Sequence, residues 1–315
     1  MVRVHAGEQK VLLITYLNFV MALFCRDFLK AITLIQRKEE NGSLVPIATG
    51  FIVGFLLKGN PDPTKRTYSI FLLTNRHVFS NADQLWVRFD KKEEVQTASY
   101  PIQLKNGEQI LWLAHQDPKV DLALMAIDPN FLDRNKINWG FINEENIAYP
   151  EQFHEIGIDL GDCVFLSGFP MGLSGINQNN AIVRGGIIAR IDNEQITSEK
   201  SFLIDATVLP GNSGGPVFLK PESNFLNGTT AVNNSYLIGV VSGYRTYKEQ
   251  LYSLQTNPPS VAAISVENSG LASIVPMNFA KDIYNDFIIA KKGLEKEIVG
   301  DEKTVGDNVE TMIKS

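Results

Sequence analysis

Short apolar segments bounded by turn-forming residues recur along almost the whole chain of 315 residues. The first series begins at Ala31 and runs AITLIQ, ATGFIVGFLL, YSIFLLT, QLWVRF, ILWLA and DLALMAI. After a more polar stretch over 128–159, a second series follows: CVFLSGF, AIVRGGIIARI, SFLIDATV, GGPVFL and SYLIGVVSGY. Segments of this length, separated by Asn, Gly, Asp and Pro, are typical of antiparallel β-strands. The sequence therefore predicts an all-β chain with two strand-rich units.

Four regions are predicted from this pattern. We expect a helical segment over 1–30, a first β-barrel over 31–140, a linker and second β-barrel over 141–278, and a closing helix with a tail over 279–315. After Asn278, a residue typical of helix N-caps, apolar residues recur at helical spacing. They are Phe279, Ile283, Phe287 and Ile288. We expect the closing helix to pack on the second unit.

Charge and cysteine content limit the partners and cofactors. The net charge of -6 and the pI near 5.4 provide no basic field for phosphates, so nucleic acid is not expected to bind. Cys25 and Cys163 lie far apart and fit buried thiols in a reducing compartment, so a cytoplasmic location is predicted. The four histidines are scattered and no pair has ligand spacing, so neither a metal nor another cofactor is expected.

One apolar run, from Val11 to Cys25, resembles part of an export signal. It follows Arg3 and Lys10, but bulky Phe24 stands where a signal peptide carries small residues. The run is also too short to span a membrane, so no membrane span is expected. We predict a helix that packs on the body of the protein, and export through this segment is the alternative.

The segment PGNSGGPVF, from Pro210 to Phe218, places a serine among glycines. Gly211 permits a sharp turn, and the N–H groups of Gly211 and Ser213 could both donate to an oxyanion. The two glycines that follow Ser213 leave its Oγ accessible. Such a loop fits the nucleophile of an acyl-transfer reaction, whereas the alternative is a glycine-rich hairpin turn.

A serine becomes a nucleophile only when a base accepts its proton, and the chain has four histidines for that role. His77 directly follows an apolar strand, which could hold an imidazole rigidly at a cleft. The other three lie in polar or charged surroundings and are predicted to be surface residues. They are His5, His115 and His154.

The third member of such a site is a carboxylate that accepts a hydrogen bond from the imidazole and fixes its tautomer. Asp121 opens the segment DLALMAI, whose apolar side chains would bury the carboxylate near the imidazole. Asp117, next to Pro118, has the setting of a solvated turn and is the alternative. We therefore predict a catalytic triad of His77, Asp121 and Ser213.

The order His, Asp, Ser and the motifs TNRHV, VDLALM and GNSGGP resemble those of chymotrypsin-like serine peptidases. ATGFIV resembles the early strand of that family, and GFPMGL resembles the start of its second barrel. Asn75 and Arg76, with DATVLPGNSGGP and IVRGGIIARI, bring the chain nearest to bacterial proteases of the HtrA/DegP type, although no PDZ domain is expected. The matches extend from about Ala31 to Asn278. The resemblance implies two antiparallel six-stranded barrels and a serine endopeptidase that hydrolyses protein or peptide substrates through an acyl-enzyme.

The resemblance also implies where substrate binds. In this family the residue six positions before the nucleophile lies near the base of the S1 pocket, which places Thr207 there. The stretch GVVSGY resembles the pocket wall that pairs with the extended substrate. The residues so assigned are Gly239, Val240, Val241, Ser242 and Gly243. Because position 207 has no carboxylate to pair with Lys or Arg, small or medium apolar side chains are predicted at P1.

Two alternatives to a simple enzyme stay open at this point. A binding or scaffold protein could use the same fold, because a fold can outlast its chemistry. A latent protease would need an activating partner protein. The polar stretches 221–235 and 245–270 are predicted to be enlarged surface loops around the second unit, which either bind a partner or are simply solvated.

Overall fold

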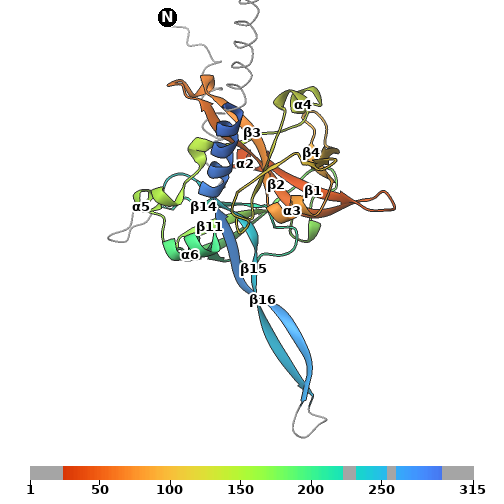
Figure 1. The fold of residues 1–315 in the computed structure, drawn as a ribbon, viewed down its shortest axis with the longest axis vertical. Helices are drawn as coiled ribbons and strands as arrows, with labels where there is room; N and C mark the ends of the chain where they lie inside the picture. The colour runs from red at the N-terminus through yellow and green to blue at the C-terminus, as the bar shows by residue number, and fades with distance from the viewer. Residues whose placement is uncertain (1–23, 223–231, 254–259, 293–315) are drawn as a thin grey trace, which may run out of the picture.

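Two β-sheet units form the body of the protein, the first from the N-terminal half of the chain and the second from the C-terminal half (Figure 1). The computed structural model describes residues 24–222, 232–253 and 260–292. Short helices connect the strands: α2 (Arg26–Leu29), η1 (Pro63–Lys65), α3 (Arg76–Ser80), α4 (Pro129–Arg134), η2 (Glu144–Asn146), η3 (Pro150–Gln152), α5 (Phe153–Ile156), η4 (Pro170–Gly172) and α6 (Asn193–Glu199). The predicted predominance of β-structure is confirmed.

The first unit is an eight-stranded sheet. Seven strands follow the order β5-β4-β1-β2-β3-β9-β8 with antiparallel pairing, and β10 pairs parallel with β2. They are β1 (Ile32–Lys38), β2 (Leu44–Lys58), β3 (Thr67–Thr74), β4 (Gln84–Asp90), β5 (Thr97–Gln103), β8 (Leu113–Ala114), β9 (Ala123–Ala126) and β10 (Ile142–Asn143); β6 (Lys105–Asn106) and β7 (Gln109–Ile110) form a separate hairpin. In the described pairing β5 and β8 are the two free edges. The predicted six-stranded barrel is therefore wrong for this unit in both strand number and closure.

The second unit is a closed barrel of six antiparallel strands in the order β11-β12-β13-β16-β15-β14. Its strands are β11 (Cys163–Gly168), β12 (Ile182–Arg190), β13 (Phe202–Asp205), β14 (Pro216–Leu219), β15 (Leu237–Ser253) and β16 (Ser260–Pro276). The six-stranded barrel predicted for this half of the chain is confirmed.

The two longest strands of the second unit leave the barrel as a two-stranded arm (Figure 1). Residues 245–253 and 260–270 lie in these paired strands, so the prediction of a surface loop over 245–270 is wrong for the described part of that stretch. Of the other predicted loop, residues 223–231 lie outside the described residues, and an isolated bridge between Glu222 and Val232 flanks them.

Alternation of buried and partly exposed side chains explains how these strands form a core. In β4 the residues Leu85, Val87 and Phe89 are buried while their neighbours are only half-buried, which is the period-two pattern of a strand with one inward face. Phe51 and Phe71 fill the first unit, and Phe202 lies at the centre of the second. Burial of such large apolar side chains provides the main stabilisation of both units.

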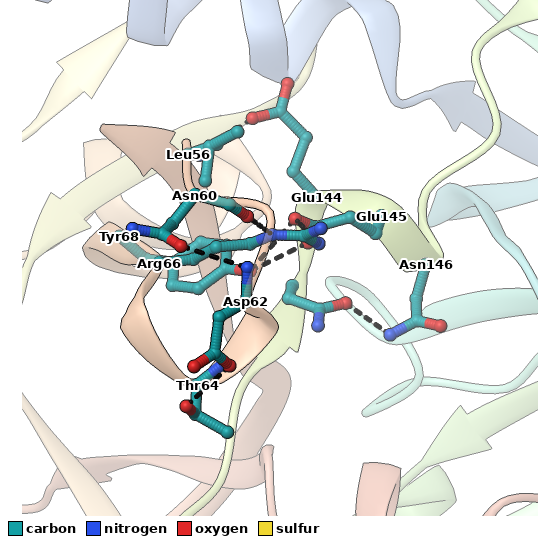
Figure 2. Close-up of polar contacts among 10 residues, drawn as sticks. Leu56, Asn60, Asp62, Thr64, Arg66, Tyr68, Glu144, Glu145 and Asn146 are labelled. Atoms are coloured by element: carbon teal, nitrogen blue, oxygen red, sulfur yellow. Dashed lines mark hydrogen bonds and ion pairs between the residues drawn. The ribbon is translucent and has the colours of Figure 1, made fainter. Parts of the chain in front are cut away.

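The segment between the units is attached to the first sheet by its own side chains. The Leu56 N–H donates to Glu144 Oε2 at 2.7 Å. The Glu145 carboxylate accepts from Arg66 Nη1 at 2.9 Å and from the Tyr68 hydroxyl at 3.0 Å (Figure 2). Together with the pairing of β10 on β2, these contacts show that the first unit continues past the boundary predicted at residue 141.

The two helical ends pack on different units. Phe28 of α2 stacks on Phe218 of β14, with ring centroids 4.9 Å apart, whereas residues 1–23 of the predicted N-terminal helix lie outside the described residues. The C-terminal helix is described over 278–292, and its Tyr284 stacks on Phe55 of β2 at 4.7 Å. The prediction that this helix packs on the second unit is wrong. Within the described ranges, no helix is both apolar enough and long enough to span a bilayer.

Candidate active site

His77 is positioned by the end of β3. The strand stops at Thr74, and buried Asn75 precedes the short helix α3, which carries His77. Asn75 Nδ2 donates to the Asp121 carbonyl oxygen at 2.9 Å, and this bond ties the turn to the segment just before β9. The His77 side chain is 48% exposed, so its ring faces the solvent side of the junction.

The Asp121 carboxylate holds His77 at two points, one on the imidazole and one on the backbone. Its Oδ2 lies 2.7 Å from His77 Nδ1, and its Oδ1 accepts the His77 backbone N–H at 3.0 Å. An ionised carboxylate only accepts hydrogen bonds, so Nδ1 must carry a proton. The neutral ring therefore has its lone pair on Nε2, which is the form that a general base requires.

A chain of contacts connects this pair to Ser213. The hydroxyl of Ser242, in β15, donates to Asp121 Oδ2 at 2.7 Å. Ser213 Oγ in turn lies 3.5 Å from the Ser242 carbonyl oxygen, which is at the limit of hydrogen bonding. Within the described residues no hydrogen bond joins Ser213 to His77. So weak a contact leaves the Ser213 hydroxyl free to rotate about its Cα–Cβ bond.

Two glycines shape the loop that carries Ser213. Gly211 and Gly214 adopt left-handed conformations with φ of 97° and 80°. A Cβ atom on Gly211 would lie 2.3 Å from the Phe169 carbonyl oxygen, and one on Gly214 would lie 2.1 Å from the Thr49 carbonyl oxygen. Glycine is therefore required at both positions for conformation and for space.

The peptide before Gly211 is oriented by a neighbouring loop. The Pro210 carbonyl oxygen accepts the N–H of Met171, a non-glycine residue with φ of 55°, at 2.6 Å. The N–H and C=O of a trans peptide point in opposite directions, so the Gly211 N–H points away from Met171. In the described part of the chain neither Gly211 N–H nor Ser213 N–H donates to a protein acceptor. Both groups are thus available to an external oxygen.

Thr49, in β2 of the first unit, is hydrogen-bonded to the loop of the second unit that carries Ser213. Its Oγ1 donates to the Gly211 carbonyl oxygen at 2.7 Å and accepts the Phe169 N–H at 3.1 Å. Its backbone N–H donates to the Ser213 carbonyl oxygen at 2.9 Å, and its own carbonyl accepts the Thr74 hydroxyl at 2.8 Å. Thr49 is fully buried, so each of these bonds is shielded from water.

Replacement of Thr49 by valine is expected to loosen the serine loop. The change keeps the side-chain shape but leaves two buried backbone groups unpaired, at about 1–3 kcal/mol each. We expect a lower free energy of unfolding in denaturant titrations and, because the loop presents Gly211 and Ser213, a loss of at least about tenfold in kcat/KM. Thr33→Val is the matched control, since Thr33 is a buried threonine of β1 whose hydroxyl contacts Gly50. An equal activity loss in both variants would contradict the role of Thr49.

The residues predicted to bind substrate differ in their exposure. Thr207 is exposed, and its place near the base of the S1 pocket stays a prediction. Gly239, Val240 and Val241 are buried within the barrel wall, where Gly239 and Val240 pair with β14. Their assignment as substrate-binding residues stays a prediction, because pairing with an extended substrate would use the backbone of this strand. Only Ser242 and Gly243 of that stretch are partly exposed.

The alternative site residues have other settings. Asp117 Oδ1 accepts the Lys119 N–H at 2.9 Å, and its other oxygen lies 3.3 Å from Lys200 Nζ, an arrangement of a charged surface turn. His115 packs edge-on against Phe279, and His154 is exposed on α5. His5 lies outside the described residues. Asp121 is thus the aspartate that contacts both His77 and Ser242, and Ser242 contacts Ser213.

A two-unit β-fold with an Asp-held His and a glycine-flanked Ser at the junction defines the class of chymotrypsin-like serine peptidases. Residues 48–225, more than half of the chain, match the family model described as a trypsin-like peptidase domain. The chain therefore belongs to the trypsin-like peptidase family.

Curated relatives point to the same branch of that family. A probable periplasmic serine endoprotease DegP-like of Rickettsia conorii is 26% identical over 196 residues, which is 61% of this chain and 30% of the relative. A protein of the same description from Pseudomonas putida (strain W619) is 24% identical over 236 residues, which is 72% of this chain and 38% of the relative. The chain thus spans about a third of the length of these relatives. The resemblance to HtrA/DegP-type proteases is confirmed.

A solved structure, a thermostable serine protease AL20 from an extremophilic microorganism, overlaps 81% of this chain and 95% of its own, with 12% identity and a TM-score of 0.42.

The predicted cytoplasmic location is corrected by these comparisons. The relatives are named probable periplasmic serine endoproteases, a location that contradicts the predicted one. The prediction depended on the two cysteines as buried thiols; both are free thiols, but Cys25 is exposed and Cys163 is partly exposed, so neither is buried. Free thiols do not establish a reducing compartment, because an exported protein need not form disulfides.

Proposed function

We propose that the protein is a serine endopeptidase that hydrolyses peptide bonds with His77, Asp121 and Ser213 as its triad. The observation that carries this proposal is the double hydrogen bond from His77 to Asp121, which leaves Nε2 as the basic nitrogen at the junction where Ser213 lies. Both the predicted base and the predicted nucleophile are present, which favours an enzyme over a binding or scaffold protein.

In the proposed reaction Ser213 Oγ attacks the scissile carbonyl carbon while His77 Nε2 takes its proton. The N–H groups of Gly211 and Ser213 stabilise the oxyanion of the tetrahedral intermediate. The imidazolium, held by Asp121, then protonates the leaving amine, which gives an acyl-enzyme on Ser213. Water activated by His77 attacks the acyl carbon, releases the carboxylate product and restores the serine.

Hydrolysis of unfolded casein by the purified chain tests the activity. We expect new peptide termini at internal bonds, detected by mass spectrometry of the digest. An intact substrate after prolonged incubation with a chain of native circular dichroism would contradict the proposal for the chain on its own. An activating partner protein stays a prediction, and the observation that favours it is the contact of Ser213 Oγ with Ser242 rather than with His77.

We also propose that small or medium apolar side chains are preferred at P1. Thr207 supplies no carboxylate, and a desolvated Lys or Arg side chain without a partner would cost several kcal/mol. A peptide library with all side chains at P1 measures the preference through relative kcat/KM values. A profile dominated by Lys or Arg would overturn this prediction.

Export is proposed from the names of the relatives, which are periplasmic endoproteases. Fractionation of cells that carry an epitope-tagged full chain tests it. Recovery in the exported fraction supports export, and recovery with a cytoplasmic marker enzyme would contradict it.

A further inference from the structure

The arm formed by β15 and β16 begins at the candidate active site. Ser242, whose carbonyl oxygen lies 3.5 Å from Ser213 Oγ, belongs to β15. From Gly243 the strand continues for eleven residues to Ser253. At about 3.3 Å per residue these residues cover about 36 Å. The same strand that borders the nucleophile therefore extends well outside the barrel (Figure 1).

In the described part of the chain, β15 beyond Gly243 pairs with a strand on one side only. β14 pairs with β15 only between Leu237 and Val240, and the Val241 backbone bonds to Gly214 and Gly215 of the serine loop. Beyond that point β16 is the strand that pairs with β15 in the described part of the chain. An edge strand presents unpaired N–H and C=O groups that are ready to bind another extended chain.

The side chains of β15 within the arm are exposed and partly apolar. Every residue of β15 from Tyr244 to Leu251 is exposed, with Tyr247 51% and Leu251 50% accessible. The charged residues of the described arm balance, two positive and two negative. They are Arg245, Lys248, Glu249 and Glu267. Such a surface suits a neutral, apolar polypeptide better than an anionic partner.

We infer that the free edge of β15 extends the substrate-binding cleft and binds the unfolded chain on the N-terminal side of the scissile bond. This inference rests on the proposed function. A substrate antiparallel to β15, with its reacting carbonyl at Ser213, directs its N-terminal side from Ser242 toward Ser253. The edge continues without interruption from the site itself, which identifies the occupant as the substrate.

Two physical arguments support this occupant. Ser242 borders only the residues next to the scissile bond, so the exposed strand beyond Gly243 offers an extended substrate further contact area. A two-stranded hairpin alone is marginally stable in water, and a third strand adds a row of hydrogen bonds and cross-strand contacts. The substrate class is therefore unfolded polypeptide with a long extended stretch before the cleaved bond.

The test compares peptides that share one reporter bond and carry either three or about ten residues on its N-terminal side. For the full chain we expect the ratio of kcat/KM between the long and short peptides to reach about tenfold or more, from several added cross-strand pairs. An equal extension on the C-terminal side is the control peptide and should add little. A ratio near one for the N-terminal extension would overturn the inference.

Two sets of variants locate the effect on β15. Removal of residues 247–267, with an Asn-Gly turn joining Thr246 to Asn268, should abolish the length dependence. Because that variant could fail to fold, Tyr247→Thr with Leu251→Thr should reduce the ratio while keeping good strand formers. The matched control is the pair of changes Ile264→Thr and Val266→Thr on β16, which is one strand further from the bound chain. Equal effects of both pairs would overturn the placement on β15.

Failure of the proposed function has a different signature. If the full chain hydrolyses neither peptide and a fluorophosphonate does not label Ser213, the endopeptidase proposal fails and this inference falls with it. A different outcome overturns this inference alone. In that outcome short and long peptides are cleaved alike, and removal of the arm converts an oligomer of the full chain into a monomer in solution. The arm would then bind a second copy of the chain and not the substrate.

Discussion

Substitution of Ser213 by alanine is expected to lower kcat for peptide hydrolysis about a million-fold, the size of effect seen when a serine peptidase loses its nucleophile. The physical reason is that no acyl-enzyme can form, and only water remains to attack the substrate carbonyl. Stability should change little, because Ser213 Oγ makes one contact of 3.5 Å in the described structure. Initial rates with a fluorogenic peptide and thermal unfolding measure the two quantities.

Ser80→Ala is the matched control for this variant. Ser80 lies on α3 close to His77, and its hydroxyl donates to the Arg76 carbonyl oxygen at 2.8 Å. We expect its activity to equal that of the unchanged chain. Residual hydrolysis by Ser213→Ala within tenfold of the control would remove this serine from the mechanism.

Replacement of Asp121 by asparagine is expected to lower kcat about ten-thousandfold. The carboxylate accepts hydrogen bonds from the His77 N–H, from Nδ1 and from the Ser242 hydroxyl. An amide nitrogen facing Nδ1 would donate instead, so the ring proton would move to Nε2. The imidazole could then no longer accept the proton of Ser213.

Asp117→Asn separates this effect from a general loss of charge. Asp117 is the other aspartate before β9, and its contacts are with Lys119 and Lys200 at the surface. Its removal should leave kcat unchanged. A large loss for Asp117→Asn with an active Asp121→Asn variant would show that the orienting carboxylate had been misassigned.

The strand pattern predicted the closed second barrel but not the architecture of the first unit. Periodicity identifies which residues face a core, and this holds for Leu85, Val87 and Phe89. It does not say which edges meet, so neither the open edges β5 and β8 nor the addition of β10 could be predicted. Likewise the spacing after Asn278 indicates a helix with one buried face. The residues that this face contacts, Phe55 and Phe71, lie more than two hundred positions earlier in the sequence, so the spacing could not identify them.

The arm was predicted as a loop for a related reason. Its strands bury no continuous apolar face, so alternation of apolar and polar residues, the usual signature of a strand, is weak there. What holds β15 to β16 is the backbone ladder from Thr246 to Ser253, and backbone pairing has no sequence pattern of its own.

In the candidate site too, the sequence predicted what is local and missed the contacts between residues remote in sequence. Local motifs located His77, Asp121 and Ser213, because each motif contains the turn or strand end that positions its residue. The contacts of Thr49 with Gly211 and of Ser242 with Asp121 span 162 and 121 residues. The only signal in the sequence was a threonine or serine inside an otherwise apolar strand. Counting six positions before Ser213 identified Thr207 as a pocket residue, but that spacing does not indicate whether the Thr207 side chain is exposed.

The most direct test of the central claim is site mapping of a fluorophosphonate adduct on the native full chain by peptide mass spectrometry. The reagent phosphonylates a serine only when an adjacent base activates it, so it reports on all three residues at once. We expect one adduct, on Ser213, in the native protein, and its loss after denaturation or in a His77→Ala variant. An unmodified Ser213, or equal labelling without His77, would contradict the triad.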